Sequence, residues 1–111
     1  MKPISKRLLI HSVVLHTSPT SDGWGGGSAT DVTIDHVRLE PSSAYVVTKD
    51  NEKVTLSAVL IYDSRHSTEL NFDWTNSLGW KITGLGRTYT VVKADPFYDE
   101  KRLHHWEMGL L

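Results

Sequence analysis

Apolar and polar residues alternate in several short segments of the chain, and no window repeats apolar residues at the three- and four-residue spacing of a helix. Because successive side chains of a strand point to opposite faces, this alternation indicates half-buried strands. Such segments lie at residues 12–17, 31–39, 54–62, 80–83, 88–93 and 103–110. The pattern predicts an all-β fold of five to six strands with long loops and little helix.

The second of these segments changes phase in its middle. Val32 and Ile34 share one face of a strand, whereas Val37 and Leu39 have the opposite parity. A flat strand cannot bury all four side chains, but a β-bulge near residues 35–36 would return them to one face. Small barrels and sandwiches turn their corners with such bends, so we expect a small curled β-barrel or sandwich.

Three further features refine the predicted strands. Residues 54–62 carry apolar side chains on both faces at their centre, which predicts one strand that is covered on both sides. Gly84–Arg87 predicts a hairpin turn. Pro96 is expected to end the strand that begins after this turn. The last segment alternates so that the even-numbered residues from His104 to Leu110 share one face.

Two polar segments are long enough to reach other molecules. Residues 18–30 are rich in Gly, Ser and Thr and contain Trp24, a large aromatic residue that normally packs against something. We therefore predict that Trp24, with Gly25 and Gly26, forms an interface. Residues 42–53 form a second polar excursion, which has a short apolar stretch and in which we expect a short piece of strand.

Composition limits the functional classes. The chain has 111 residues, a usual size for one domain, so we treat residues 1–111 as a single domain. Its formal net charge of −1 lacks the basic excess of a freestanding DNA-binding module. The absence of cysteine excludes disulfides and thiolate metal sites. The apolar run Leu8–Ile10 is too short for a signal-peptide core or a membrane span, so we expect no membrane contact.

The sequence carries no catalytic or metal-binding signature. Six histidines are present, but no His-x-His or HExxH motif joins them. His104 and His105 are adjacent, so they should point to opposite faces of a strand and share an ion poorly. Asp63–His66 combines acid, nucleophile and base types, yet neighbours in sequence do not converge on one point, and we interpret the segment as a polar loop. We expect no cofactor, no metal and no catalysis.

Several segments together resemble a known family. They are residues 1–9 and 11–13 at the start, 32–39 in the second strand, 86–93 after the hairpin turn, and 104–107 near the end. In this order they are similar to the minor capsid proteins encoded in head–tail gene clusters of tailed phages and prophages of Gram-positive bacteria. None of the segments is a catalytic signature, so the match is specific through their combination, which spans nearly the whole chain.

The resemblance implies a head-closure, or connector, subunit with a fold similar to a small curled β-barrel carrying long loops. Such proteins form a ring beneath the portal or its adaptor, seal the DNA-filled capsid and offer a surface to the tail. The implied partners are the portal or adaptor ring, the tail proteins and further copies of the chain, while packaged DNA passes nearby without sequence-specific binding. The protein would be made in the host cytoplasm and would reside in the virion at the head–tail interface.

In proteins of this kind, a loop at the place of residues 42–53 projects toward the central channel. An ordinary solvated hairpin is the alternative at this position. The residues at the expected channel tip, which are balanced in charge, are Lys49, Asp50, Asn51, Glu52 and Lys53.

Three other functions stay open at this point. A tail-completion protein shares the small β architecture. A ligand-binding β-barrel would line a pocket with Trp80, Tyr89 and Trp106, and a small hydrolase would use His66 or His104. Because the loops are polar, we also expect the isolated protein to be monomeric or weakly associated.

Overall fold

A computed structural model describes residues 4–17, 31–47, 50–70, 74–100 and 102–111. These residues form one turn of 3-10 helix, η1 (Lys6–Leu8), and eight strands. The strands are β1 (His11–His16), β2 (Asp31–Pro41), β3 (Tyr45–Val47), β4 (Lys53–Thr55), β5 (Ala58–Asp63), β6 (Lys81–Gly84), β7 (Arg87–Tyr98) and β8 (Leu103–Leu110). The predicted all-β fold with little helix is confirmed.

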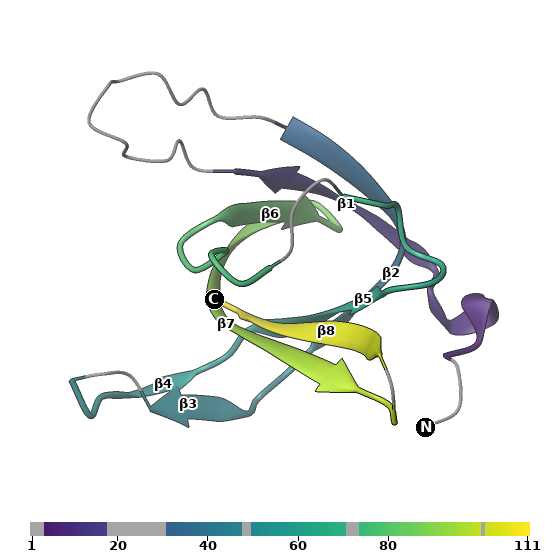
Figure 1. Cartoon of the computed structure of the whole chain (residues 1–111). Helices are drawn as coiled ribbons and strands as arrows, with labels where there is room; N and C mark the ends of the chain where they lie inside the picture. Colours follow the sequence, from purple (N-terminus) through teal and green to yellow (C-terminus); the bar gives the residue numbers. More distant parts are fainter. Residues whose placement is uncertain (1–3, 18–30, 48–49, 71–73, 101) are drawn as a thin grey trace, which may run out of the picture.

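Six antiparallel strands close into a barrel in the order β1-β2-β5-β8-β7-β6 (Figure 1). The barrel is closed by β1 and β6, where Val14 lies opposite Thr83 and Leu15 opposite Ile82. The other two strands, β3 and β4, form a separate two-stranded sheet. Of the two predicted architectures the molecule therefore adopts the barrel, and closure removes most of the sheet edges that would otherwise invite unspecific pairing.

The phase change in β2 is a bulge. His11 pairs with Val37 and Val13 with Ile34, so β2 uses one residue more than β1 between these two pairs. His36 adopts a positive φ of 57° at this point. Ile34 and Val37 are consequently both buried, and from Val37 onward β2 pairs with β5. The bend expected at residues 35–36 is confirmed, and it turns the sheet toward closure.

Apolar side chains from all six barrel strands fill the inside of the barrel. Trp74 joins them from the irregular segment between β5 and β6 and is only 1% exposed. The strand residues of this core are Val13, Leu15, Ile34, Val37, Leu39, Ala58, Leu60, Ile82, Tyr89, Val91, Trp106, Met108 and Leu110. Removal of these side chains from water is the main favourable contribution to the stability of the barrel.

The predicted end of the strand at Pro96 is wrong. β7 continues through Pro96, which lies opposite Trp106 of β8, and ends at Tyr98. Beyond Thr90, β7 pairs with β8 alone, since its pairing with β6 covers only the first part of the strand. A strand with a neighbour on one side tolerates a proline because fewer of its N–H groups are needed for pairing.

The single strand predicted over residues 54–62 is also wrong, because the chain changes partner in the middle of this segment. Its first part belongs to β4 in the small sheet, and its second part belongs to β5 in the barrel. At the break, Leu56 donates its N–H to the carbonyl of Ala44, whereas Ser57 donates its N–H to the carbonyl of Leu110 in β8. The apolar pattern runs through the break because Leu56 is buried as well.

Residues 42–57, which contain β3 and β4, are termed the arm, and Figure 1 shows the arm extending away from the barrel. It continues the ribbon of β2 and β5 beyond the pair Pro41 and Ala58. Leu56 is buried outside the core and packs where β8 has Gly109, since a Cβ at that glycine would lie 3.0 Å from both Cδ atoms of Leu56. Leu56 therefore fastens the base of the arm to the outer wall of the barrel.

The predicted hairpin between β6 and β7 is confirmed. Leu85 and Gly86 form its two-residue loop with positive φ values of 52° and 78°, as in a type I′ turn. Glycine suits such a position, whereas leucine is an unusual occupant. Gly84 is required for space, because a Cβ there would lie 2.7 Å from Cγ1 of Val13 and 3.0 Å from Cδ2 of Leu39.

Candidate interaction surfaces

The arm exposes apolar side chains on a very short sheet. No residue of β3 or β4 is buried. Tyr45 pairs with Thr55 and Val47 with Lys53, and both Tyr45 and Val47 are more than half exposed. Lys53 Nζ lies 3.8 Å from the centroid of the Tyr45 ring, a cation–π contact that orients both side chains.

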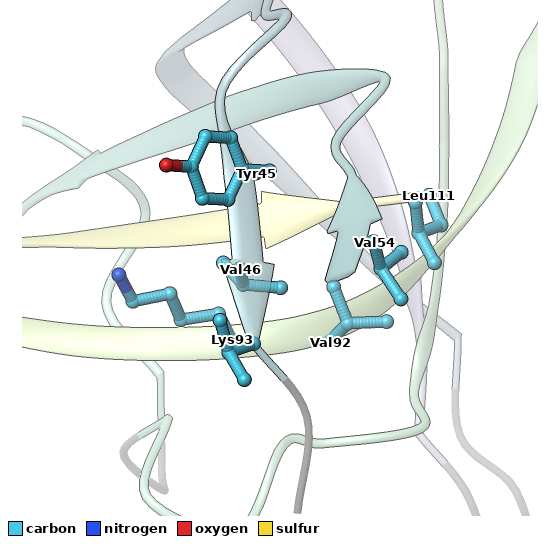
Figure 2. A pocket seen from close by; sticks show the side chains of 7 residues that line it. Tyr45, Val46, Val54, Val92, Lys93 and Leu111 are labelled. Carbon is cyan, nitrogen blue, oxygen red and sulfur yellow. The ribbon is translucent and has the colours of Figure 1, made fainter. Parts of the chain in front are cut away.

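A groove separates the arm from the barrel (Figure 2). Its volume is about 540 Å³, within the range of about 300–1,000 Å³ that is common for binding sites. Val46 and Val54 of the arm approach Val92 of β7 in this view. The groove is lined by Tyr45, Val46, Val47, Val54, Val92, Lys93 and Leu111. The arm and β7 thus form an apolar hollow that none of the sequence patterns had indicated.

The structure brings the predicted channel residues together at the end of the arm. Asp50, Asn51, Glu52 and Lys53 are all exposed, while Lys49 lies outside the described residues. Asn51 has a positive φ of 61°, which asparagine accepts more readily than most residues. The expected short strand in this excursion is confirmed by β3, whereas the channel role of the tip stays a prediction.

The predicted interface residues Trp24, Gly25 and Gly26 lie outside the described residues. The strands before and after them are described, and His16 at the end of β1 pairs with Asp31 at the start of β2. The strand ends on either side of the segment therefore lie next to each other. A contact between Trp24 and another molecule stays a prediction.

A second apolar feature lies at the end of β7. Phe97 and Tyr98 are exposed there, and the Phe97 ring is stacked on His105, with centroids 4.8 Å apart and planes 1° from parallel. His105 Nε2 donates to Glu107 Oε2 at 2.8 Å, and its Nδ1 is hydrogen-bonded to His104 Nδ1, also at 2.8 Å. The two histidine rings therefore meet, and the expectation that they point apart is wrong.

One polar chain on the barrel surface combines residue types of catalytic sites. His16 Nδ1 donates to Asp31 Oδ1 at 2.7 Å, and His16 Nε2 lies 2.9 Å from Thr83 Oγ1, which in turn lies 2.9 Å from Thr88 Oγ1. Sequence reasoning missed this chain because strand pairing brings together residues that are far apart in sequence. These four residues line neither the groove beneath the arm nor the hollow beside the turn after β5.

The segment after β5 uses its polar residues to form a tight turn. The Asp63 carboxylate is buried and accepts the backbone N–H groups of Arg65 at 2.7 Å and His66 at 2.9 Å. The Ser64 hydroxyl donates to carbonyl oxygens at the start of β8. These bonds agree with the interpretation as a polar loop. In the part of the chain that the structure describes, no group of three or more His, Cys, Asp or Glu residues could hold a metal ion.

The aromatic residues considered for a ligand pocket belong to the barrel core or pack against it. Tyr89 and Trp106 are buried in the core, and Trp80 packs against it. A hollow of about 440 Å³ beside the turn after β5 is lined by Trp106 together with Tyr62 and Trp74, but by neither Trp80 nor Tyr89. The barrel interior is occupied by side chains, which argues against a carrier whose ligand lies inside it.

Tyr62 also lines that hollow, and the fold changes the ionisation of its phenol. Its hydroxyl donates to the carbonyl of Thr68 at 2.6 Å. Burial raises the pKa of Tyr62 above its ordinary value, and the nearby carboxylates of Glu69 and Asp63 raise it further. The phenol therefore stays neutral and acts as a hydrogen-bond donor in the neutral pH range.

A family model described as "Minor capsid protein" matches residues 5–110. The chain belongs to the minor capsid protein family. The resemblance inferred from the sequence is confirmed, and no curated protein and no solved structure matches the chain. As a minor capsid protein, the chain is a structural component of a phage virion.

The family assignment changes how the surfaces of this minor capsid protein are weighed. Exposed apolar features are expected where a virion component meets its neighbours. The arm with its groove and the aromatic end of β7 are such features. Among the described residues, the helical content is too short and too polar to include a membrane-crossing segment.

Proposed function

We propose that this minor capsid protein is a head-closure subunit. Copies of the chain form a ring beneath the portal or its adaptor, seal the DNA-filled capsid and provide the surface on which the tail docks. The observation that carries the proposal is the arm: it is anchored at both ends in the barrel through β2 and β5, yet its two strands have no buried residue. An element that is held at its base and exposed along its length is suited to reach into a channel or across to another subunit.

The tip of the arm faces the central channel in this proposal. Lys49 and Lys53 balance Asp50 and Glu52, so the tip carries no net charge. Lysine-rich surfaces grip DNA by displacing its counterions, and a balanced tip lacks that effect. Packaged DNA therefore passes or rests against the arm without being bound in a sequence-specific way.

The remaining surfaces take other parts in the same role. Trp24, with Gly25 and Gly26, docks on the neighbouring ring or tail protein, since glycines let a segment adapt while the aromatic side chain supplies contact area. The subunit carries out no reaction and needs no cofactor. Its function depends on fit between macromolecules.

Shortening the arm tests the proposal. Deletion of Asp50–Glu52 leaves Thr48 and Lys49 between the paired residues Val47 and Lys53, and two residues suffice for a β-hairpin loop. The variant should fold and form its ring, but filled heads should lose DNA before tails attach. The double substitution Asp50→Asn and Glu52→Gln keeps the length and should retain DNA if reach, and not charge, makes the seal.

Particle images of the same mutants decide between roles at the junction. If filled heads with the shortened arm and a normal ring keep their DNA, the arm does not seal the channel. A subunit found on isolated tails and absent from tail-less heads would instead identify a tail-completion protein.

Trp24→Ala should leave the melting temperature nearly unchanged and reduce head–tail joining. Unfolding of that variant would contradict the interface assignment.

A further inference from the structure

Two histidine rings lie against each other at the start of β8. His104 is 5% exposed and His105 is 8% exposed, so both rings are enclosed by protein. Their Nδ1 atoms are 2.8 Å apart. The rings meet edge to face, with centroids 5.1 Å apart, and His105 Nε2 is bonded to Glu107 Oε2 on the other side of its ring. The position of each ring is therefore fixed by a hydrogen bond to the other.

The contact between the two Nδ1 atoms limits how many protons the pair can hold. In a hydrogen bond between two nitrogens, one nitrogen donates and the other accepts, so only one proton lies between them. A neutral imidazole carries one ring proton and an imidazolium carries two, so two separate rings can hold four in total. The bonded pair of His104 and His105 holds three at most, whichever ring is the donor.

Charged groups on neighbouring elements surround the pair. Asp63 of β5 lies opposite His105. Asp95 of β7 lies opposite Glu107 and binds Lys93 at 3.2 Å. The turns next to the pair add Tyr62, Arg65, His66, Asp99, Glu100 and Arg102, while Lys101 lies outside the described residues. Carboxyl groups ordinarily titrate at about pH 4 and histidine at about pH 6.5, so a response between these values reports on histidine.

The pair supports the end of β7. The Phe97 ring is stacked on His105 with centroids 4.8 Å apart, and Tyr98 lies opposite Leu103 across the turn (Figure 1). This part of β7 is paired with β8 alone, because its pairing with β6 ends at Thr90. A rotation of the His105 ring would therefore remove a side-chain contact from a strand end that has a neighbour on one side only.

We propose that His104 and His105 form a proton-sensitive latch on the end of β7. The latch is closed while one Nδ1 atom of the pair accepts from the other. When both rings become imidazolium, two Nδ1–H groups face each other, the hydrogen bond breaks and the two positive rings separate. The stack of Phe97 on His105 is lost with it, while the remainder of the barrel stays closed. The latch is a property of the subunit itself and does not depend on a role in head closure.

The direction of the pH dependence follows from the proton count. The open latch binds one proton more than the closed latch, so acid favours the open form. An unperturbed histidine takes up its second ring proton at about pH 6.5. The closed form is therefore fully favoured above that pH and loses stability as the pH falls below it. The equilibrium constant for opening should approach a tenfold increase for each further pH unit, since the two forms differ by one proton.

Nuclear magnetic resonance at about pH 7 and about pH 5, on either side of the ordinary histidine titration, tests the latch. Between these values the nuclear Overhauser contact between the Phe97 and His105 rings should disappear. Protection of the Asp99 amide, which donates to the Arg102 carbonyl, should fall about tenfold or more after correction for intrinsic exchange. Protection of Leu60 in the barrel should stay unchanged. An equal fall at Leu60, or no change at Asp99, would overturn the inference.

His104→Gln separates the latch from other effects of acid. A glutamine amide can donate to a neutral His105 Nδ1 or accept from a protonated one, so the limit on the proton count is removed. The Asp99 amide of this variant should show the same protection at both pH values. His66→Gln is the matched control, because it removes a histidine of the turn after β5 and should keep the parent response.

Nitrogen-15 spectra of the imidazole rings decide the question in the parent protein, even if His104→Gln does not fold. At the lower pH, molecules that retain the contact between Phe97 and His105 should have one unprotonated Nδ1 in the pair. Two imidazolium rings together with an intact contact would overturn the inference. So would a His104→Gln variant that keeps the parent pH response, or a His66→Gln variant that loses it.

Discussion

The barrel and the arm are built from the same kind of strand, but they differ in what surrounds each strand. Leu60 in β5 is completely buried, and its strand has neighbours on both sides. Val47 in β3 is 63% exposed, and its strand has a partner only in β4. A two-stranded sheet alone is marginally stable in water. The arm therefore depends on the barrel for its position, and its apolar residues remain available for contact.

This difference separates stability from recognition within one chain. Core residues of the barrel determine the free energy of unfolding, because they carry most of the buried apolar area. The exposed residues of the arm add little to it, so substitutions there can alter binding without altering the fold. The predictions below test how sharp this division is.

The largest effect is expected from the barrel core. Leu60→Ala should lower the free energy of unfolding by about 2–5 kcal/mol, since it leaves a cavity among buried side chains. Val47→Ala removes a similar apolar group from the arm and should change the same quantity by less than about 0.5 kcal/mol. Urea denaturation of both variants measures the difference. Comparable losses would mean that the arm is part of the cooperative core.

A smaller effect is expected where the arm is fastened to the barrel. Leu56→Ala removes a buried side chain outside the core and should cost about 1.5–3 kcal/mol, the value of exposing one such residue. Amide exchange should accelerate at Val46 and Val54 of the arm and stay slow at Leu60 and Met108. Equal acceleration in the arm and in the barrel would contradict a separate anchoring role for Leu56.

Gly109→Ala offers an independent route to the same contact. The added methyl group would lie 3.0 Å from both Cδ atoms of Leu56 and 3.3 Å from Cβ of Lys93, so Leu56 has to move. The exchange pattern should then match that of Leu56→Ala. If amide exchange in the arm is as slow as in the parent protein, Leu56 can repack without releasing the arm.

The residue at the first position of the β6–β7 turn does not give the barrel its highest stability. Leu85 has a positive φ of 52°, a conformation that costs most residues about 1–2 kcal/mol. Leu85→Asn supplies the residue that a type I′ turn favours at this position and should raise the free energy of unfolding by about 1 kcal/mol. Thermal unfolding checks the sign. A lower melting temperature would show that Leu85 has a packing role that its exposure conceals.

The smallest effect concerns Tyr62 beside the irregular segment. Tyr62→Phe loses the hydrogen bond to Thr68 and should cost about 0.5–1 kcal/mol near neutral pH. The raised pKa means that the fold favours the neutral phenol, so this contribution is complete below the ordinary tyrosine pKa of 10.0 and is lost as the pH rises through the higher value of the folded state. The parent protein should therefore lose stability more steeply than the variant at alkaline pH. Parallel stability curves for the two proteins above that pH would contradict the assignment.

Local patterns in the sequence were sufficient for much of the barrel. The opposite parity of Ile34 and Val37 could be satisfied only by a bulge, and the bulge is present between them. The even-numbered face of β8 from His104 to Leu110 is buried as expected. Gly84–Arg87 marked the hairpin correctly, although Leu85 and not a second glycine takes one of its positive φ values.

The predictions from sequence failed where the outcome depended on which strands pair with each other. Pro96 is a reliable strand breaker only if both sides of the strand are paired, and pairing on one side was not visible in the sequence. The apolar run across Leu56 continued through a change from one sheet to another, because Leu56 is buried against the outside of the barrel. The groove was missed for the same reason, since Val46 and Val92 come from segments that only the folded chain brings together.

Gly84 constrains how sequences of this family can diverge. Its missing side chain leaves room for Val13 and Leu39, whose methyl groups would lie within 3.0 Å of any Cβ at position 84. An alanine at position 84 therefore becomes tolerable when position 13 or position 39 becomes smaller in the same lineage. Among related chains that keep the closed barrel, substitutions at these three positions should covary, with glycine at 84 accompanying branched residues at 13 and 39.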